Sequence, residues 1–133
     1  MCVRVNLKAQ DDDRLAEYLW PIVREIAKTA IENGQNLIIE GCYVPFEWRR
    51  DFDERYLASI RFICLAMTDA SIDAHFEEIL QHASDIEARL DDSGCTPESL
   101  KADNRIYREG FSLAGDQVTL IDGDYEESLN AIL

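Results

Sequence analysis

The sequence predicts an α/β domain in which helices cover both faces of a parallel sheet, in three layers. Short apolar runs, typical of buried strands, alternate with longer segments whose apolar residues recur every three or four positions, as in amphipathic helices. Strands that alternate with helices favour a parallel sheet with right-handed crossovers. Two apolar runs end in an acidic residue and a glycine, Glu40-Gly41 and Asp122-Gly123, at the strand ends where such sheets bind ligands.

Length and charge limit the classes of protein to consider. The 133 residues suffice for one core, so we expect a single domain over residues 1–133. The net charge of −14 disfavours nucleic acid and anionic membranes as partners. No apolar run approaches the roughly 18 residues that span a bilayer, and the first ten residues lack the apolar core of a signal peptide. The cysteines form no Cys-x-x-Cys pair, which suits the cytoplasm and argues against structural zinc.

The N-terminal part is expected to hold a strand, a helix and a second strand. Apolar and polar residues alternate over residues 3–7, a weak strand signal. An acidic cluster then precedes an amphipathic helix over residues 13–33, which should end at Asn33-Gly34 and kink near Pro21. Residues 35–41, Gln-Asn-Leu-Ile-Ile-Glu-Gly, predict a strand that is buried on both faces.

The middle of the chain is expected to continue with a helix, a strand and a helix. Aromatic residues and a polar face predict a short helix over residues 47–58. Residues 60–67 are almost entirely apolar and predict a strand. Thr68 and Asp69 offer a cap for a helix over residues 70–82.

The last third should contain two helices, a strand and a terminal helix. A helical stretch is expected over residues 83–90 and a further helix over residues 96–111, which Thr96-Pro97 should start. Residues 118–121 predict a strand, and Asp124 should cap the last helix.

The motifs, in this order, resemble the C-terminal two-thirds of an adenylate kinase or a related P-loop kinase. Leu37-Ile38-Ile39-Glu40-Gly41 resembles the family's Leu-Leu-Asp-Gly, and Met67-Thr68-Asp69-Ala70-Ser71-Ile72 resembles its Val-Pro-Asp-Glu-Leu outline. Arg89-Leu90-Asp91-Asp92 is similar to the lid signature Arg-x-Asp-Asp, and Ile121-Asp122-Gly123 to the final Val-Asp-Gly. Residues 40–48 also resemble small, uncharacterised bacterial kinase-like proteins.

The resemblance implies an incomplete P-loop kinase-like fold and the ancestry of a nucleotide or small-molecule kinase, a transferase. It implies catalytic roles for Glu40, at the magnesium shell, and Arg89, over the transferring phosphate. The other implied contacts are with a small phosphorylated substrate, at Gly41, Arg49 and Arg50, and with the cofactor, at Arg105 and Arg108. A surface role for Arg49 and Arg50, as solvated helix charges, is an equal alternative, and no metal ligand is assigned.

One departure from the family decides the functional expectation. The chain contains no G-x-x-x-x-G-K-[ST], the loop whose amides, lysine and hydroxyl hold the transferring phosphates and magnesium. We therefore expect an N-terminally shortened chain that is inactive as a kinase by itself and binds no cofactor. Magnesium and ATP are implied only for an intact relative. The alternative is a non-catalytic binding or oligomerisation module derived from the fold.

The same departure predicts a partner. In the kinase fold the strand before the phosphate loop lies between the strands that end here at Glu40 and Met67. Without it, unpaired amides and carbonyls would each cost about 1–3 kcal/mol. Residues 2–7 or a second copy of the chain could cover these groups, and we favour a homodimer.

Two further groups of side chains were weighed. His75, Glu78, His82 and Asp85 lie near one face of a helix, where a metal could bind, but acidic helices often show such spacing by coincidence. Tyr18, Trp20, Trp48 and Phe52 are interpreted as core residues rather than as a surface for stacking bases.

Overall fold

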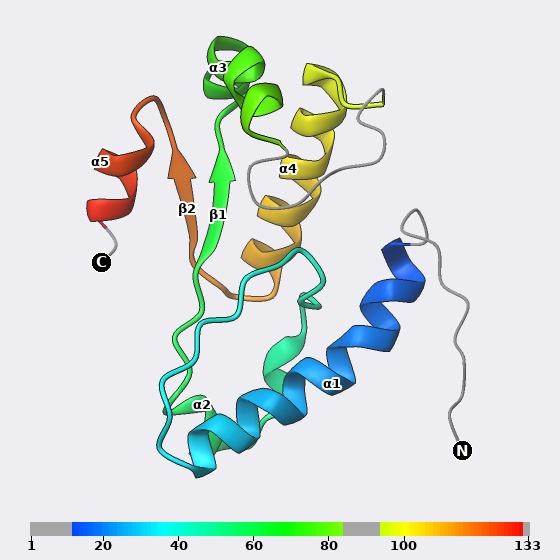
Figure 1. Cartoon of the computed structure of the whole chain (residues 1–133), viewed down its shortest axis with the longest axis vertical. Helices are drawn as coiled ribbons and strands as arrows, with labels where there is room; N and C mark the ends of the chain where they lie inside the picture. Colours follow the sequence, from blue (N-terminus) through cyan, green and yellow to red (C-terminus); the bar gives the residue numbers. More distant parts are fainter. Residues whose placement is uncertain (1–11, 84–93, 132–133) are drawn as a thin grey trace. The chain divides into compact units, whose positions relative to one another are not determined.

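The computed structural model describes residues 12–83 and 94–131 and has a mixed α/β structure (Figure 1). The strand expected at residues 3–7 lies outside the described residues, as does nearly all of the helix expected at 83–90. The chain divides into two compact units, Met1–Arg61 and Phe62–Leu133. That residues 1–133 form a single domain stays a prediction.

The first unit is built on helix α1, Asp12–Glu32, which confirms the long predicted helix. The helix continues through Pro21. It ends as predicted, because Gly34 adopts a φ of 63°, which glycine tolerates best. The amide of Gln35 donates to the carbonyl of Ala30 at 2.8 Å and that of Gly34 to Ile31 at 3.1 Å, the two bonds of a Schellman motif.

Aromatic rings form the core of this unit. The Phe52 ring packs edge-on against Trp20 at 6.2 Å and against Trp48 at 6.0 Å, between ring centroids, and Trp48 and Phe52 are buried. The indole nitrogen of Trp20 donates a hydrogen bond to Asp51 at 2.7 Å. These contacts confirm the interpretation of the three rings as core residues, whereas Tyr18 is 45% exposed.

The single helix predicted over residues 47–58 is wrong, because two shorter elements replace it. A 3-10 helix, η1 (Trp48–Asp51), is followed by α2 (Glu54–Leu57). Phe52 between them has an extended backbone, with φ −126° and ψ 138°. Asp53 then caps α2, accepting hydrogen bonds from the amides of Arg55 and Tyr56. The extended residue turns the Phe52 ring into the aromatic core, which a continuous helix would not do.

The strand predicted over residues 35–41 is also wrong. These residues form neither helix nor strand, and Leu37, Ile38 and Ile39 are 49%, 86% and 44% exposed. A strand requires a hydrogen-bonded neighbour, and no other described residue shares a backbone hydrogen bond with residues 36–40. The apolar composition of this run is typical of a strand, but the structure describes no neighbouring strand that pairs with it.

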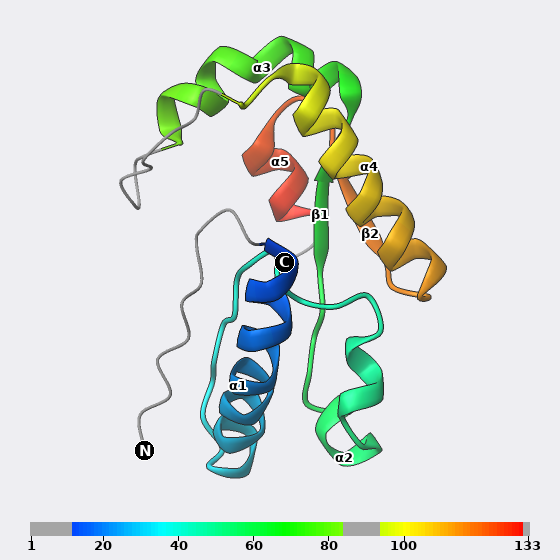
Figure 2. The same cartoon turned by 90° about the vertical axis from the view of Figure 1, so that its right-hand side faces the viewer.

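The second unit contains a parallel pair of strands, β1 (Cys64–Met67) and β2 (Val118–Ile121), with Cys64 beside Val118 and Met67 beside Ile121. The prediction for 118–121 is confirmed. Of the strand predicted over 60–67, only the part opposite β2 forms a ladder. Helices α4 (Pro97–Leu113) and α5 (Tyr125–Asn130) lie on opposite sides of the pair (Figure 2). Within the described residues the sheet has two strands, so the larger three-layer sheet is not confirmed.

The helices of this unit begin where the sequence predicts. Helix α3 (Asp69–His82) is capped by the hydroxyl of Thr68, and α5 by the carboxylate of Asp124. Thr96 and Ser99 form a capping box at the start of α4, and Gly115, with φ 88°, ends that helix in a second Schellman motif. Among the described helices, none has the length and apolar content that a bilayer crossing requires.

The core of the second unit gathers around Ile72, whose side chain is fully buried. Helix α4 packs against both strands and against α3, and α5 contacts β2. The Phe62 and Phe111 rings meet with centroids 4.9 Å apart. The buried side chains of this unit thus include Cys64 and Ala66 of β1, Ile72 of α3 and Phe111 of α4.

We expect Ile72→Ala to lower the free energy of unfolding by about 2–5 kcal/mol, because it leaves a cavity in this core. Urea denaturation followed by circular dichroism measures the effect. The matched control is Ile106→Ala on α4, where the side chain is 58% exposed and the change should stay within about 0.5 kcal/mol. Equal losses in the two variants would contradict the assignment of Ile72 to the core.

Candidate functional site

The carboxyl ends of β1 and β2 form a polar cluster, here named the strand-end site: Thr68, Asp69, Ser71, Asp122 and Gly123. The Thr68 hydroxyl donates to the Asp122 carboxylate at 2.9 Å and accepts from the Ser71 amide at 3.1 Å. The Thr68 amide donates to the carbonyl of Ile121 at 3.1 Å, and the amide of Gly123 to the buried Ser71 hydroxyl at 3.4 Å. One threonine thus joins both strand ends to the start of α3.

Helix α4 fixes the end of β1 through an asparagine. The side-chain oxygen of Asn104 accepts a hydrogen bond from the amide of Met67 at 2.9 Å, and its nitrogen donates to the carbonyl of Leu100 at 3.2 Å. The amide of Met67 would otherwise be an unpaired donor next to the sheet. Asn104 therefore has a structural role that also holds α4 beside the strand-end site.

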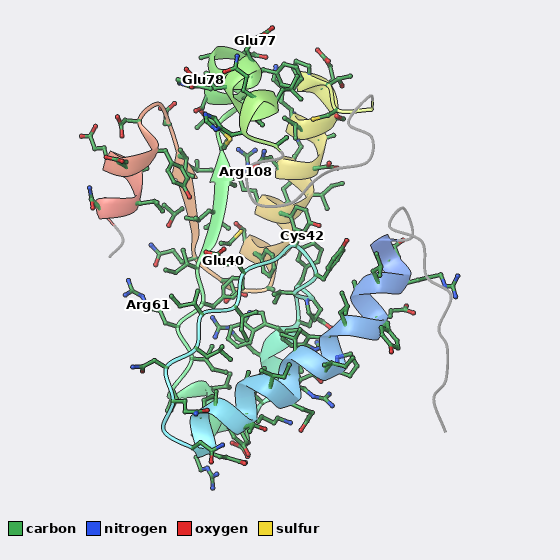
Figure 3. The ribbon with its side chains drawn as sticks, in the orientation of Figure 1. Glu40, Cys42, Arg61, Glu77, Glu78 and Arg108 are labelled. Carbon is green, nitrogen blue, oxygen red and sulfur yellow. The ribbon has the colours of Figure 1, made fainter. Side chains whose placement is uncertain are left out.

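Two ion pairs connect α3 to α4. Arg105 lies 3.7 Å from the Asp69 carboxylate, and Lys101 lies 2.5 Å from that of Asp73. The hydrogen bond that the Lys101 amine donates to the Asp73 carboxylate raises the pKa of Lys101, so this amine stays charged at neutral pH. Each cation has a carboxylate beside it, which leaves little net positive charge for a phosphate. Arg108, further along α4 (Figure 3), has no ion-pair partner among the described residues.

The predicted substrate residues lie in the first unit. Glu40 is exposed on the irregular stretch between α1 and η1 (Figure 3), so its expected place at the end of a strand is wrong. Gly41 follows it and is also exposed. The guanidinium of Arg49 lies 4.5 Å from the centre of the Trp48 ring, and Arg50 pairs with Glu47 at 2.6 Å. These contacts give both arginines a structural role, and their phosphate contacts stay a prediction.

The predicted pair of Glu40 and Arg89 is not tested, because Arg89 lies outside the described residues. Arg105 and Arg108 lie on the same helix, α4, as expected, and their contacts with a cofactor stay a prediction. The structure brings Arg105 to the strand-end site through Asp69. Of the predicted functional residues that the structure describes, Arg105 is thus the one that contacts the strand-end site.

The helical group considered for a metal is only partly described. His75 and Glu78 pair at 3.0 Å, whereas Asp85 lies outside the described residues. Over residues 12–83 and 94–131, no three or more His, Cys, Asp or Glu side chains are arranged to hold a metal ion. The His75–Glu78 contact is therefore interpreted as a surface pair on one helix.

Sequence reasoning missed Ser71, Lys101 and Asn104. A usable signal exists for the ion pairs: Asp69 and Asp73 are four residues apart, as are Lys101 and Arg105, so each pair lies on one helix face. Asn104 is a polar residue on the side of α4 that faces the strands. Its bond to Met67 depends on how α4 packs, which no local pattern reveals.

Burial changes the chemistry of one thiol near this core. Burial raises the pKa of the Cys64 thiol, and the negative charge of Asp116 raises it further. A thiol rather than a thiolate is therefore present at neutral pH, and thiols are poor nucleophiles. Cys64 is a packing residue and not a candidate for covalent catalysis.

The comparisons with known proteins add no family: no protein-family model matches the chain, and neither does a curated protein or a solved structure.

Thr68→Ala should lower the free energy of unfolding by about 1–2 kcal/mol, because α3 loses its cap and Asp122 loses a donor. Chemical denaturation of the purified variant measures this loss. Thr68→Ser keeps the hydroxyl and is the matched control, with a change of less than about 0.5 kcal/mol expected. The central place of Thr68 would be refuted if the alanine and serine variants were equally stable.

Native alkylation should distinguish two cysteines. At pH 8 we expect Cys64 to react with iodoacetamide more than about tenfold more slowly than Cys42, which is exposed. Because burial raises the pKa of Cys64, its alkylation rate should increase with pH in both states. In the folded chain this increase should occur at a higher pH than in urea. Mass spectrometry of quenched samples gives both rates. Similar rates for Cys42 and Cys64 in the folded protein would show that β1 is open to solvent.

Proposed function

We propose that this chain is a kinase-like α/β module that binds and assembles with a protein partner and does not transfer phosphoryl groups. The strand-end site supports the kinase-like part of the proposal. Met67-Thr68-Asp69 and Ile121-Asp122-Gly123 follow adjacent parallel strands, which is the order the resemblance requires. Ligands of such sheets bind at this edge, so the site descends from one that once faced a ligand.

The pairing of Lys101 and Arg105 with carboxylates is the observation that carries the proposal, because it argues for a non-catalytic role. Phosphoryl transfer needs positive charge that is aimed at the phosphates. At this site Lys101 and Arg105 are each within 4 Å of a carboxylate of α3, and Asp122 adds a further negative charge. The 133 residues also lack the glycine-rich lysine loop that could supply the remaining contacts.

The charge of the whole chain points the same way. The chain has a net charge of −14, so it repels an approaching triphosphate unless a basic pocket attracts the phosphates. The chain carries 13 lysine and arginine residues against 27 aspartate and glutamate residues, and several of the cations form ion pairs. The composition therefore disfavours an anionic ligand, whereas a protein partner can bind through the exposed apolar surface.

Isothermal titration with magnesium-ATP tests the proposal. We expect no binding tighter than about 1 mM, equivalent to about −4 kcal/mol. The sequence contains no phosphate loop, and Lys101 and Arg105 are paired with carboxylates of α3. An intact nucleotide kinase in the same buffer serves as the positive control. A dissociation constant of about 10 µM or tighter, about −7 kcal/mol, would show that another element holds the phosphates and would overturn the non-catalytic assignment.

A further inference from the structure

Residues 36–40, Asn-Leu-Ile-Ile-Glu, combine exposed apolar side chains with a backbone that makes no backbone hydrogen bond to other described residues. Leu37, Ile38 and Ile39 expose between 44% and 86% of their surface. Within the part of the chain that the structure describes, the amides and carbonyls of residues 36–40 make no backbone hydrogen bond. An exposed apolar segment with free amides and carbonyls is a template for pairing with another strand.

Apolar surface on α1 continues this segment. Ile22 and Ile26 on α1 and Leu37 after it line one open hollow of the first unit. Ile22 and Ile26 are 46% and 52% exposed. We name the set of exposed apolar residues here the apolar patch: Tyr18, Ile22, Ile26, Leu37, Ile38 and Ile39.

The charges beside the apolar patch neutralise one another. Arg24 and Glu25, which also line the hollow, pair at 2.9 Å, and Lys28 lies 3.3 Å from the same carboxylate. Arg24 also lies 3.7 Å from the Asp51 carboxylate, so two cations stand against two carboxylates.

The exposed fractions of the six residues of the apolar patch correspond to accessible surface on the order of 600 Å² in total, and Ile22, Ile26 and Leu37 share the hollow. A stable interface buries about 800 Å² per partner, which the apolar patch and its polar rim together can supply. In a chain of net charge −14, this is a surface where two copies can approach without strong repulsion.

We propose that two copies of this chain form a homodimer in which residues 36–40 of each copy pair antiparallel around a two-fold axis at Ile38. A two-fold axis pairs each residue with its symmetry counterpart in reversed order. Ile38 then faces Ile38 of the second copy, Leu37 faces Ile39, and Asn36 faces Glu40. The amide of Asn36 can donate to the carboxylate of Glu40, and the two glutamates lie at opposite ends of the ribbon.

The charge of Glu40 selects this arrangement over a parallel one. In a parallel in-register pair the two Glu40 carboxylates would be neighbours, and like charges on adjacent strands are destabilising. The homodimer rests on the proposed assembly function and specifies it, because it names a second copy of the chain as the protein partner. Its test uses no nucleotide, so a failure of the homodimer and a failure of the non-catalytic assignment are separate results.

Sedimentation equilibrium of the full chain measures the dimer. For a 15.2 kDa chain we expect a mass near twice that value at about 50 µM protein. Ile38→Glu should weaken the dimer at least about tenfold, because it places two like charges opposite each other. Ile38 is 86% exposed, so the change spares the core, and circular dichroism checks the fold.

The matched control is Leu113→Glu, the same change of charge at a residue that is 90% exposed in the second unit. It should leave the dimer intact. A monomeric wild-type chain at about 50 µM would overturn the proposal. It would indicate that another segment of the same chain, for example residues 2–7, covers the apolar patch. A dimer that Ile38→Glu leaves as tight as wild type would overturn it as well.

Cross-linking tests the register. In a chain whose Cys2, Cys42 and Cys95 are replaced by serine, Ile38→Cys places two thiols on directly opposite residues, with Cα atoms about 4.5–5.5 Å apart, which a disulfide can span. We expect rapid formation of a disulfide-linked dimer on mild oxidation. Leu113→Cys in the same background should stay unlinked at the same concentration. Equal linking of the two variants would refute pairing at Ile38.

Discussion

The parallel pairing of β1 with β2 is the constraint on which the second unit depends. Parallel neighbours cannot be joined by a tight turn, so the chain needs a crossover, in which α3 and α4 take part. A two-stranded sheet is marginal by itself and requires helices against it. Thr68 fixes the start of the crossover and Gly115 its end, while Ile72 fills the space between the layers.

The local features of the fold could be predicted from sequence because their causes are local. Thr68, Thr96-Pro97 and Asp124 mark helix starts through their own backbone hydrogen bonds, and Asn33-Gly34 marks a helix end for the same reason. The run at 118–121 was predicted without error because a strand partner lies beside it. The run at 35–41 also has an apolar centre, Leu37-Ile38-Ile39, but no described strand pairs with it. Strand formation is a property of two segments, which explains why one prediction held and the other did not.

The candidate site was harder to predict because it depends on packing between distant segments. The motifs Thr68-Asp69 and Asp122-Gly123 were recognised as strand ends, yet their hydrogen bond joins residues 54 positions apart. Glu40 was assigned to a strand end that does not form, and Arg89 lies outside the described residues. Arg105 lies beside Asp69, a contact that only the packing of α3 against α4 creates, and its expected contact with a cofactor stays a prediction. The exposure of Leu37 to Ile39, by contrast, is what an apolar run without its neighbour should show.

Amide hydrogen exchange over residues 36–40, measured on the full chain at two concentrations, tests the assembly role most directly. At about 100 µM the amides at the centre of the segment should be protected, because the second copy accepts their hydrogen bonds. At about 0.5 µM they should exchange freely, while the amides of β1 and β2 keep their protection at both concentrations. Protection of residues 36–40 that does not change with concentration would place their partner in the same chain and contradict a homodimer formed through this segment.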